Sequence, residues 1–449
     1  MNLPRPPLLR LDGLHRLLMS SALVQGLGLV LTLLLGILLA RWLGPVSLGV
    51  YGLFMATVSI ANVPAQFGLP ILALKEAAAA ESPRDGLSIL SCFLGRAVAT
   101  STVTIGGLII VILLCAPGEL EGRWGAVVAA AGIVVITALL AVATAVLRGL
   151  GHNLWGQTLD LLLKPGLTVA SVFIMFVMLG TVSAASALAA QLAAVLLCSG
   201  LAGFSLLRVM KRNETNSGPP RRNGPWRQAA FAIMLNAMLG VLNGNYPLIT
   251  AGLIVSGPDI GVFRVALSSA SLLALPAAVA NIAAGPLVAR HHAQGDGAML
   301  ARTLSHTTLA SFGATLAGLI VFALFGRTLV VALFGEAYRE AYQPLLILGV
   351  AQLITAAFGI AGTYLTLTGR ETVVLRAFAL SVPLGIASSV VLAGYWGIAG
   401  AAASTIVMTL AWHLYVFGHR RRIDVPLSLV AAIRHVGGRG ISGGRQDRC

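Results

Sequence analysis

The residues of this sequence that could do chemistry are charged side chains within long apolar stretches. They are Arg96, Asp160, Lys164, Arg264 and Arg376. A charge at the centre of a helix in lipid costs at least about 2.5 to 3.5 kcal/mol, so such residues usually face a cavity and have a task. All but one of them are basic. Facing inward, the basic side chains would offer an anion forked guanidinium donors and one ammonium point charge.

Depth within each predicted helix separates these residues. At 1.5 Å of rise per residue, Arg96 lies roughly 12 Å beyond the start of its helix, too deep to reach the headgroups easily. Lys164, Arg264 and Arg376 lie about one to two turns in, where a long side chain can instead reach the headgroups along its own stem. Asp160 and Lys164 are spaced i, i+4 with the acid first, so mutual neutralisation is favoured over a transport role. Asp160 is also the embedded carboxylate that proton coupling would use.

A run of amides and helix breakers falls in the middle of another apolar stretch, Asn243-Gly244-Asn245-Tyr246-Pro247. Irregular backbone survives at membrane depth only where protein or water satisfies its polar groups. The run therefore predicts an unwound segment that lines a cavity, with Asn243 and Asn245 as substrate contacts.

The composition identifies the elements that must hold these side chains. Of the 449 residues, 57% are hydrophobic and 10% are charged, against roughly 25% charged in ordinary soluble domains. A soluble fold is excluded, and an all-α integral membrane protein with about twelve transmembrane helices is predicted. The predicted spans are 18–40, 47–71, 88–115, 124–147, 158–180, 184–208, 228–256, 260–288, 306–332, 341–367, 372–394 and 396–418.

The net charge of +15 indicates membrane topology rather than nucleic-acid binding. With the N-terminus inside, 22 of the 30 Lys and Arg residues fall on the inner side and four on the outer side. This asymmetry predicts that both termini are cytoplasmic in a multi-pass protein of the bacterial inner membrane.

The polar segments predict four regions: an N-terminal six-helix bundle over 1–209, a cytoplasmic basic linker over 210–227, a C-terminal six-helix bundle over 228–418, and a basic, disordered cytoplasmic tail over 419–449.

An internal repeat supports the two halves. Gly44-Pro45-Val46-Ser47-Leu48-Gly49-Val50-Tyr51 before one helix corresponds to Gly257-Pro258-Asp259-Ile260-Gly261-Val262-Phe263 before another. Three further pairs share one offset of 218 residues: Ile136-Thr137-Ala138 with Ile354-Thr355-Ala356, Gly151 with Gly369, and Pro165 with Pro383. Six helices per repeat is an even number, so the halves enter the membrane in the same sense, as in parallel-repeat transporters.

These motifs, in their order and spacing, resemble the polysaccharide transporter (O-antigen flippase) family of the MATE-like superfamily. The likeness covers nearly the whole chain. The residues that carry it are Arg41-x-Leu43-Gly44-Pro45, Gly49-x-Tyr51, Phe67-Gly68-Leu69, Ile260-Gly261-Val262-Phe263 with Ala266 and Pro276, Leu333-Phe334-Gly335 with Tyr338 and Ala341, Gly369-Arg370, and Gly397-Ile398-x-Gly400-Ala401.

The resemblance implies two six-helix bundles in a V and alternating access. It also implies a substrate such as an undecaprenyl-pyrophosphate oligosaccharide, moved to the outer leaflet for lipopolysaccharide or exopolysaccharide synthesis. The implied partners are this substrate, membrane lipids, a polysaccharide polymerase and glycosyltransferases. The expected substrate-binding residues are Arg96, Lys164, Arg264, Arg376, Asn243 and Asn245, with Asp160 for ion coupling.

Three alternatives remain open. A lipid II flippase would also carry a pyrophosphate through a basic cavity, although that family's usual extra pair of helices is missing here. A cation-coupled multidrug exporter is disfavoured, because the predicted spans offer only Asp160 as an acid. A membrane glycosyltransferase is disfavoured by the lack of a long outer loop or an acidic metal pair, so no enzymatic activity, metal or cofactor is expected.

Overall fold

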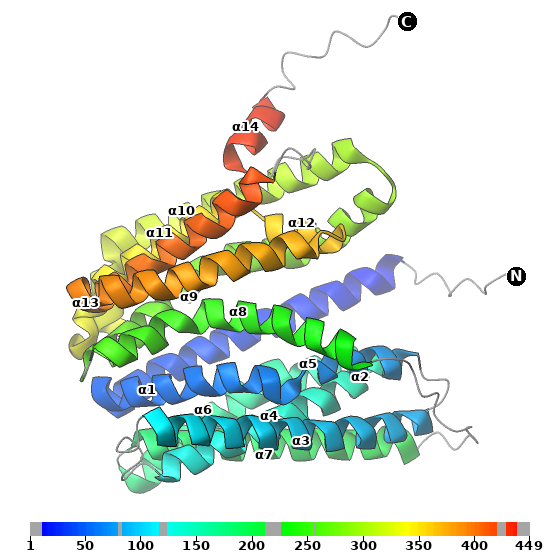
Figure 1. Ribbon diagram of the computed structural model, residues 1–449, viewed down its shortest axis with the longest axis vertical. Coiled ribbons are helices and arrows are strands. Elements are labelled where there is room, and N and C mark those ends of the chain that lie inside the picture. Colours follow the sequence, from blue (N-terminus) through cyan, green and yellow to red (C-terminus); the bar gives the residue numbers. More distant parts are fainter. Residues whose placement is uncertain are drawn as a thin grey trace, which may run out of the picture. The chain divides into compact units, whose positions relative to one another are not determined.

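The computed structural model describes residues 11–79, 83–115, 124–180, 182–211, 226–255, 257–419 and 428–437. Every regular element within these ranges is a helix (Figure 1). The elements are α1 Leu11–Gln66, α2 Leu69–Ala78, α3 Pro83–Cys115, α4 Trp124–Gly149, α5 Asn153–Thr158, the π-helical turn η2 Leu159–Leu163, α6 Lys164–Leu179, α7 Ala184–Lys211, α8 Trp226–Ile254, α9 Asp259–Ala293, α10 Gly297–Phe334, the 3-10 helix η3 Glu336–Ala341, α11 Tyr342–Ala357, α12 Ala361–Leu367, α13 Glu371–Gly418 and α14 Leu429–Gly437.

The number of membrane crossings depends on two kinked helices. In the described part of the chain, nine helices are long and apolar enough to cross a membrane. A tenth crossing is a broken span, in which Glu336–Ala357 and Ala361–Leu367 are bent by 45°. The kink at Gly44 divides α1, and the kink at Trp396 and Gly397 divides α13. When each half of these two helices is counted separately, the described helices match the twelve predicted spans.

The kinks follow from local backbone chemistry. Gly44 has φ 70° and ψ 170°, a conformation that suits only a residue without a Cβ. Pro45 follows it and restarts a helix, because its fixed φ is compatible with the first helical turn. Gly397 takes φ 56° in the same way. The Gly-Pro motif of the first repeat copy therefore separates the first two predicted spans.

The chain divides into two compact units. Unit 1 consists of Met1–Leu43 and Phe54–Val241, and unit 2 consists of Gly44–Leu53 and Leu242–Cys449. The predicted division at the linker differs from this in two respects. The residues just after the kink of α1 belong to unit 2, and the boundary in the middle of the chain falls inside α8. Residues 212–225 of the predicted linker lie outside the described residues.

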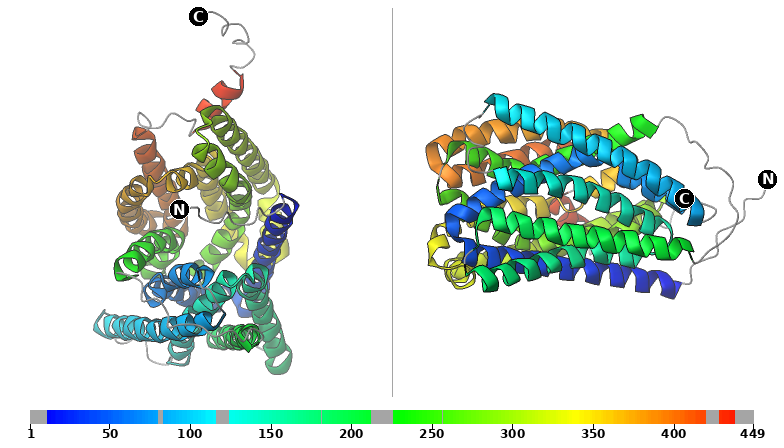
Figure 2. Two further views of the ribbon diagram at one scale, coloured as in Figure 1. Left: turned by 90° about the vertical axis from the view of Figure 1, so that its right-hand side faces the viewer. Right: turned by 90° about the horizontal axis from the view of Figure 1, so that it is seen from below.

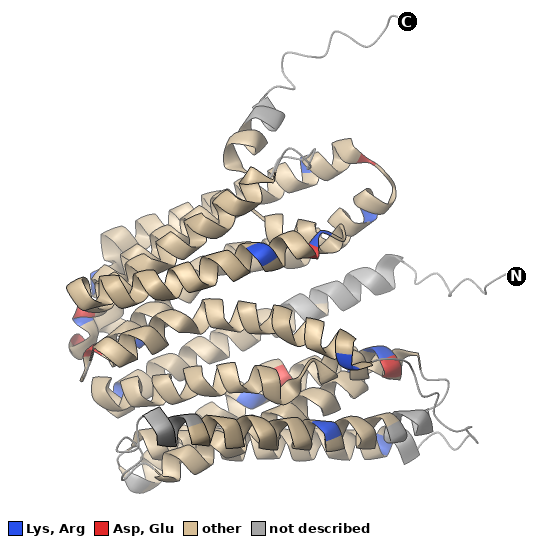
Figure 3. Cartoon of the chain, viewed as in Figure 1, with Lys and Arg blue, Asp and Glu red and all other residues tan. Residues whose placement is uncertain are grey.

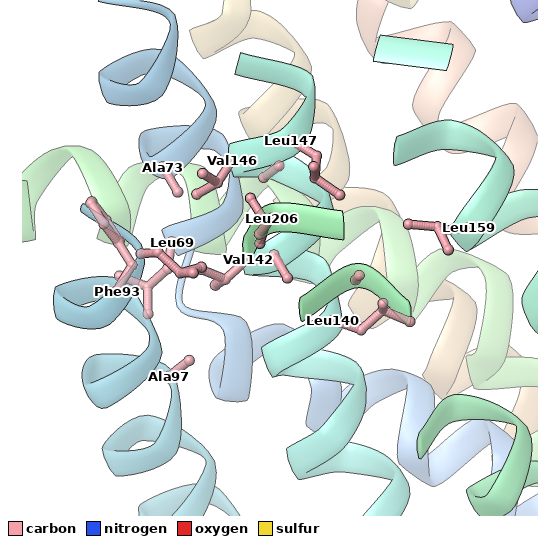
Figure 4. Close-up of a cluster of buried hydrophobic side chains, with 14 of the residues drawn as sticks. Leu69, Ala73, Phe93, Ala97, Leu140, Val142, Val146, Leu147, Leu159 and Leu206 are labelled. Carbon is pink, nitrogen blue, oxygen red and sulfur yellow. The ribbon is translucent and has the colours of Figure 1, made fainter. Parts of the chain in front are cut away.

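In unit 1, α4 provides the centre of the packing, against α2, α3 and α7 (Figures 1 and 2). Leu69 of α2, Phe93 of α3, Val142 of α4 and Leu206 of α7 are all nearly inaccessible and form one cluster (Figure 4). The close approach of these helices uses many alanines, as is usual where helices pack in lipid.

In unit 2, α9, α10 and α11 pack against one another, and α13 packs along α11. A buried cluster includes Val288, Leu304, Leu365 and Val416. The predicted tail over 419–449 contains a helix, α14, which packs against α10. The expectation of disorder is therefore wrong for Leu429–Gly437, while residues 420–427 and 438–449 lie outside the described residues.

Candidate functional site

Charged residues in the described helices lie mostly toward helix ends, with long uncharged stretches between them (Figure 3). Three other carboxylates within the described spans stand in the first turn of a helix or of the broken span: Asp259, Glu336 and Glu371. A fourth, Glu340, is exposed in the next turn of η3. The embedded residues predicted from sequence therefore remain the candidates.

Asp160 and Lys164 of unit 1 form an ion pair, with 2.8 Å between Lys164 Nζ and Asp160 Oδ1. Both side chains are partly exposed. The predicted i, i+4 pair is confirmed, and it joins the two charges to each other rather than to a third group. Within the described residues, neither side chain forms a hydrogen bond or ion pair with Arg96.

Asp160 lies on a turn of π-helix, η2, and Lys164 is the first residue after it. The helical segment from Asn153 to Leu179 is wider at this turn. Pro165 explains the widening. It has no N–H to donate to the carbonyl of Leu161, and its ring would clash with that carbonyl in a regular α-helix. The N–H of Lys164 instead bonds to the carbonyl of Leu159, five residues back. Such π-bulges are frequently found at functional sites.

The carbonyl left over by Pro165 faces α1. A Cβ built on Gly28 would collide with the carbonyl oxygen of Leu161, so only glycine allows this approach. Thr32 Oγ1 donates to the Gly28 carbonyl at 2.8 Å. The π-turn is thus fixed against α1 at a point where the backbones of two helices meet.

Arg96 lies on α3, and its guanidinium packs on aromatic rings. The guanidinium carbon is 4.1 Å from the centroid of Trp226 and 5.2 Å from that of Phe93. Trp226 is the first residue of α8, so the Arg96 guanidinium lies at the level of a helix end. This differs from the prediction that Arg96 lies too deep in its helix to reach the headgroups. The Arg96 charge also acts electrostatically on Glu76, near the end of α2. Burial raises the pKa of the Glu76 carboxyl, and the Arg96 charge acts in the opposite direction.

Arg264 belongs to unit 2 and follows the second copy of the repeat motif. Its side chain lies over Gly52, the residue that follows the first copy. A Cβ on Gly52 would be 3.3 Å from both Cγ and Cδ of Arg264. Tyr51 is also close enough to interact electrostatically with the guanidinium. Among the described residues, no carboxylate forms an ion pair with Arg264.

The two repeat motifs contact each other next to this arginine. A Cβ on Gly49 would be 3.0 Å from the amide nitrogen of Gly261, and one on Gly261 would collide with the carbonyl oxygen of Pro45. Equivalent glycines of the two motifs therefore meet within unit 2. Three positions later, directly after the two motifs, the first half of the chain has a small residue, Gly52, and the second half has a charge, Arg264.

The remaining predicted residues are in different surroundings. Arg376 is exposed near the start of α13, as expected of a side chain that reaches toward a helix end. Asn243 is exposed and Asn245 is half-buried on α8. The prediction that α8 unwinds here is wrong, because α8 is helical from Trp226 to Ile254 with Pro247 inside it.

Sequence reasoning missed a buried polar ladder between α8 and α13 in unit 2. The Tyr246 and Ser404 hydroxyls are 3.3 Å apart, and the Thr250 and Ser389 hydroxyls are 2.5 Å apart. The i, i+4 spacing of Tyr246 and Thr250 is a signal that could have placed both hydroxyls on one helix face. A buried histidine, His413, was also missed. Among the described residues, no group of three or more His, Cys, Asp or Glu side chains could hold a metal ion.

Three comparisons place this fold among known structures. No protein-family model matches the chain, and no curated protein matches its sequence. Solved structures do match. An inward-facing multidrug resistance MATE family transporter of the MOP superfamily has a TM-score of 0.68 at 17% identity, over 91% of this chain and 98% of its own. The lipid II flippase MurJ, in an inward closed conformation, has a TM-score of 0.63 at 12% identity, over 95% and 94%. MATE in complex with MaL6 has a TM-score of 0.61 at 17% identity, over 91% and 96%.

Proposed function

We propose that the protein is a flippase that moves an anionic lipid-linked oligosaccharide, carried on undecaprenyl pyrophosphate, from the inner to the outer leaflet by alternating access. The fold supports a transporter, since the similar structures are transporters and a flippase that align over nearly their whole length. The observation that carries the substrate class is the pairing of Asp160 with Lys164. With Asp160 paired, the carboxylate that remains beyond the first turn of a described span is Glu340, which is exposed near the start of the broken span.

The sign of the available charge favours an anion. Arg264 is an embedded cation that packs on Gly52 and interacts electrostatically with Tyr51, and no carboxylate of the described residues forms an ion pair with it. Its planar guanidinium can donate two parallel hydrogen bonds to a phosphate. We therefore give Arg264 the leading role in binding the pyrophosphate. Lys164, Arg96 and Arg376 are secondary contacts, and Asn243 and Asn245 are contacts to the sugar.

Lipid II flipping is the second candidate, and the likeness to MurJ is the observation that favours it. Lipid II also carries a pyrophosphate, so a basic site suits both substrates. Export of cationic drugs is the third candidate. The likeness to MATE transporters supports it, but the neutralised Asp160 opposes it, because a cationic drug would need an unpaired acid.

The membrane setting completes the proposal. We place the protein in the bacterial inner membrane with both termini in the cytoplasm, because the inner loops carry most of the basic residues. Glycosyltransferases that build the substrate and a polymerase that consumes it are the partners that this function requires.

A vesicle assay distinguishes the three candidates. The purified protein is reconstituted with a pyrophosphate-linked oligosaccharide whose sugar carries a nitrobenzoxadiazole dye, and external dithionite reduces the dye in the outer leaflet only. Protein-free vesicles should lose about half of the fluorescence, and vesicles that contain the flippase should lose nearly all of it. Dye-labelled lipid II and ethidium are tested in parallel. Faster flipping of lipid II would favour the second candidate, and ethidium transport without lipid flipping would overturn the proposal.

A further inference from the structure

His413 is a buried ionisable residue to which the proposed function gives no task. It lies on the second half of α13 in unit 2, and its side chain is 5% exposed. Its Nδ1 is 2.8 Å from the carbonyl oxygen of Thr409. A carbonyl can only accept, so Nδ1 carries the proton of the neutral ring. The lone pair is then on Nε2, which is the atom that a further proton would reach.

The ring packs at the break of the span formed by Glu336–Ala357 and Ala361–Leu367. Phe358 is the first of the three residues at this break, and its ring centroid is 4.3 Å from that of His413. The Trp412 ring packs edge-on against the histidine, with 4.7 Å between the ring centroids. The imidazole therefore contacts the non-helical turn of a membrane span directly.

The break itself depends on a tightly packed glycine. Gly359 has φ 59°, and a Cβ on it would collide with the hydroxyl of Thr308 on α10. The bend between the two parts of the span is 45°. Irregular backbone in a membrane is tolerated only where its polar groups are satisfied by surrounding protein or water. The bend therefore depends on the packing around it, and a change in the packing at Phe358 would alter the bend.

Among the described residues, no carboxylate forms an ion pair with His413. Burial and the Thr409 carbonyl are the influences that act on the ring, and no Asp, Glu, Lys, Arg or Tyr of the described parts of α9, α10, α11, α12 or α13 acts on it electrostatically. Asp160, the acid expected to couple transport to ions, is already paired with Lys164 in unit 1.

We propose that His413 is the proton-binding site of this transporter, and that its protonation rearranges the broken span at Phe358 and Gly359. A proton from water adds to the Nε2 lone pair in one conformation and returns to water in the other. A charge formed among aromatic rings at this position is costly unless the packing opens to water. The bent span thereby becomes the element whose conformation depends on protonation.

Trp412 provides a direct test that needs no substrate, since a protonated imidazole quenches an adjacent indole and a neutral one quenches it less. The chain has six Trp residues, and replacing all except Trp412 by Phe isolates its emission. In detergent, lowering the pH from 8 to 3.5 should produce a reversible fall in emission. H413Q should lose this step, and H419Q, at the end of the same helix, should retain it. No step in the single-Trp protein, or the same step in H413Q, would overturn the proposal.

A second arm, which rests on the proposed flippase function, measures transport. A pH gradient across the vesicles should change the flipping rate of the chain with His413 and should leave the rate of H413Q unchanged. H413F, which keeps a ring in the aromatic cluster, should match H413Q if protonation matters and should behave as the unmodified chain if ring packing alone matters. An emission step without any lipid flipping would contradict the proposed function and leave the proton site in place.

Discussion

The backbone of Gly261 lies where a side chain on Gly49 would have to go: a Cβ on Gly49 would be 3.0 Å from the Gly261 amide nitrogen. These glycines are equivalent positions of the two repeat motifs. The two copies of the sequence repeat therefore contact each other in the structure, and next to this contact the Arg264 side chain packs on Gly52.

Gly261 should tolerate no side chain. Its Cβ would meet the Pro45 carbonyl, which belongs to backbone that cannot rotate away. Overpacking of this kind costs about 1 to 3 kcal/mol, so G261A should lower the Tm in detergent. G285A, on the same helix with open space around the added methyl, should be neutral or slightly stabilising. Equal Tm values for the two variants would contradict the glycine contact.

Asp160 and Lys164 should behave as a structural pair. A double-mutant cycle with D160N and K164Q should give a coupling free energy of about 0.5 kcal/mol, because both side chains are partly exposed to screening. Flipping by the double variant should keep its response to a pH gradient, measured in vesicles. Loss of that response in D160N alone would return the ion-coupling role to Asp160.

Removing Arg96 should have an effect that depends on pH. Loss of its aromatic contacts should cost about 0.5 to 2 kcal/mol, and loss of its charge should raise the already elevated pKa of Glu76 further. A carboxyl whose pKa is higher in the folded than in the unfolded protein stabilises the fold at low pH. This contribution is lost as the pH rises through the folded-state pKa. The Tm deficit of R96Q should therefore be larger at pH 8 than at pH 4.

R208Q is the matched control for this pH effect. Arg208 also packs on a ring, at 4.3 Å from Phe204, so its removal should lower Tm by a similar small amount at both pH values. A pH-independent deficit in R96Q would show that Arg96 does not influence Glu76.

The Thr250 and Ser389 hydroxyls should be coupled across α8 and α13. Their separation of 2.5 Å predicts a coupling free energy of about 0.6 kcal/mol, and at most about 1.7, in a cycle of T250V and S389A. Ser388 is the control, because its hydroxyl donates to the Gly385 carbonyl of its own helix at 3.0 Å. A T250V and S388A cycle should give no coupling. Coupling of equal size in both cycles would argue against the direct contact.

The sequence predicted the spans well, because hydropathy reports burial in lipid and the Gly-Pro motifs report kinks. It also predicted the Asp160–Lys164 pair, since helical spacing alone brings these side chains together. It did not predict the environment of Arg96, because the contact with Trp226 joins residues far apart in the chain. The helical path of α8 through Pro247 was missed for another reason: neighbouring residues in a helix can satisfy the carbonyl that proline leaves free.

The flipping rate of R264Q shows whether Arg264 binds the anion. Loss of a hydrogen bond to a charged group costs about 1.5 to 3 kcal/mol, so R264Q should flip the pyrophosphate-linked oligosaccharide about 10 to 100 times more slowly. R264K should be intermediate, and R290Q, in the last turn of the same helix, should match the unmodified chain. A folded R264Q protein that flips the substrate at the unmodified rate would show that Arg264 does not bind the anion.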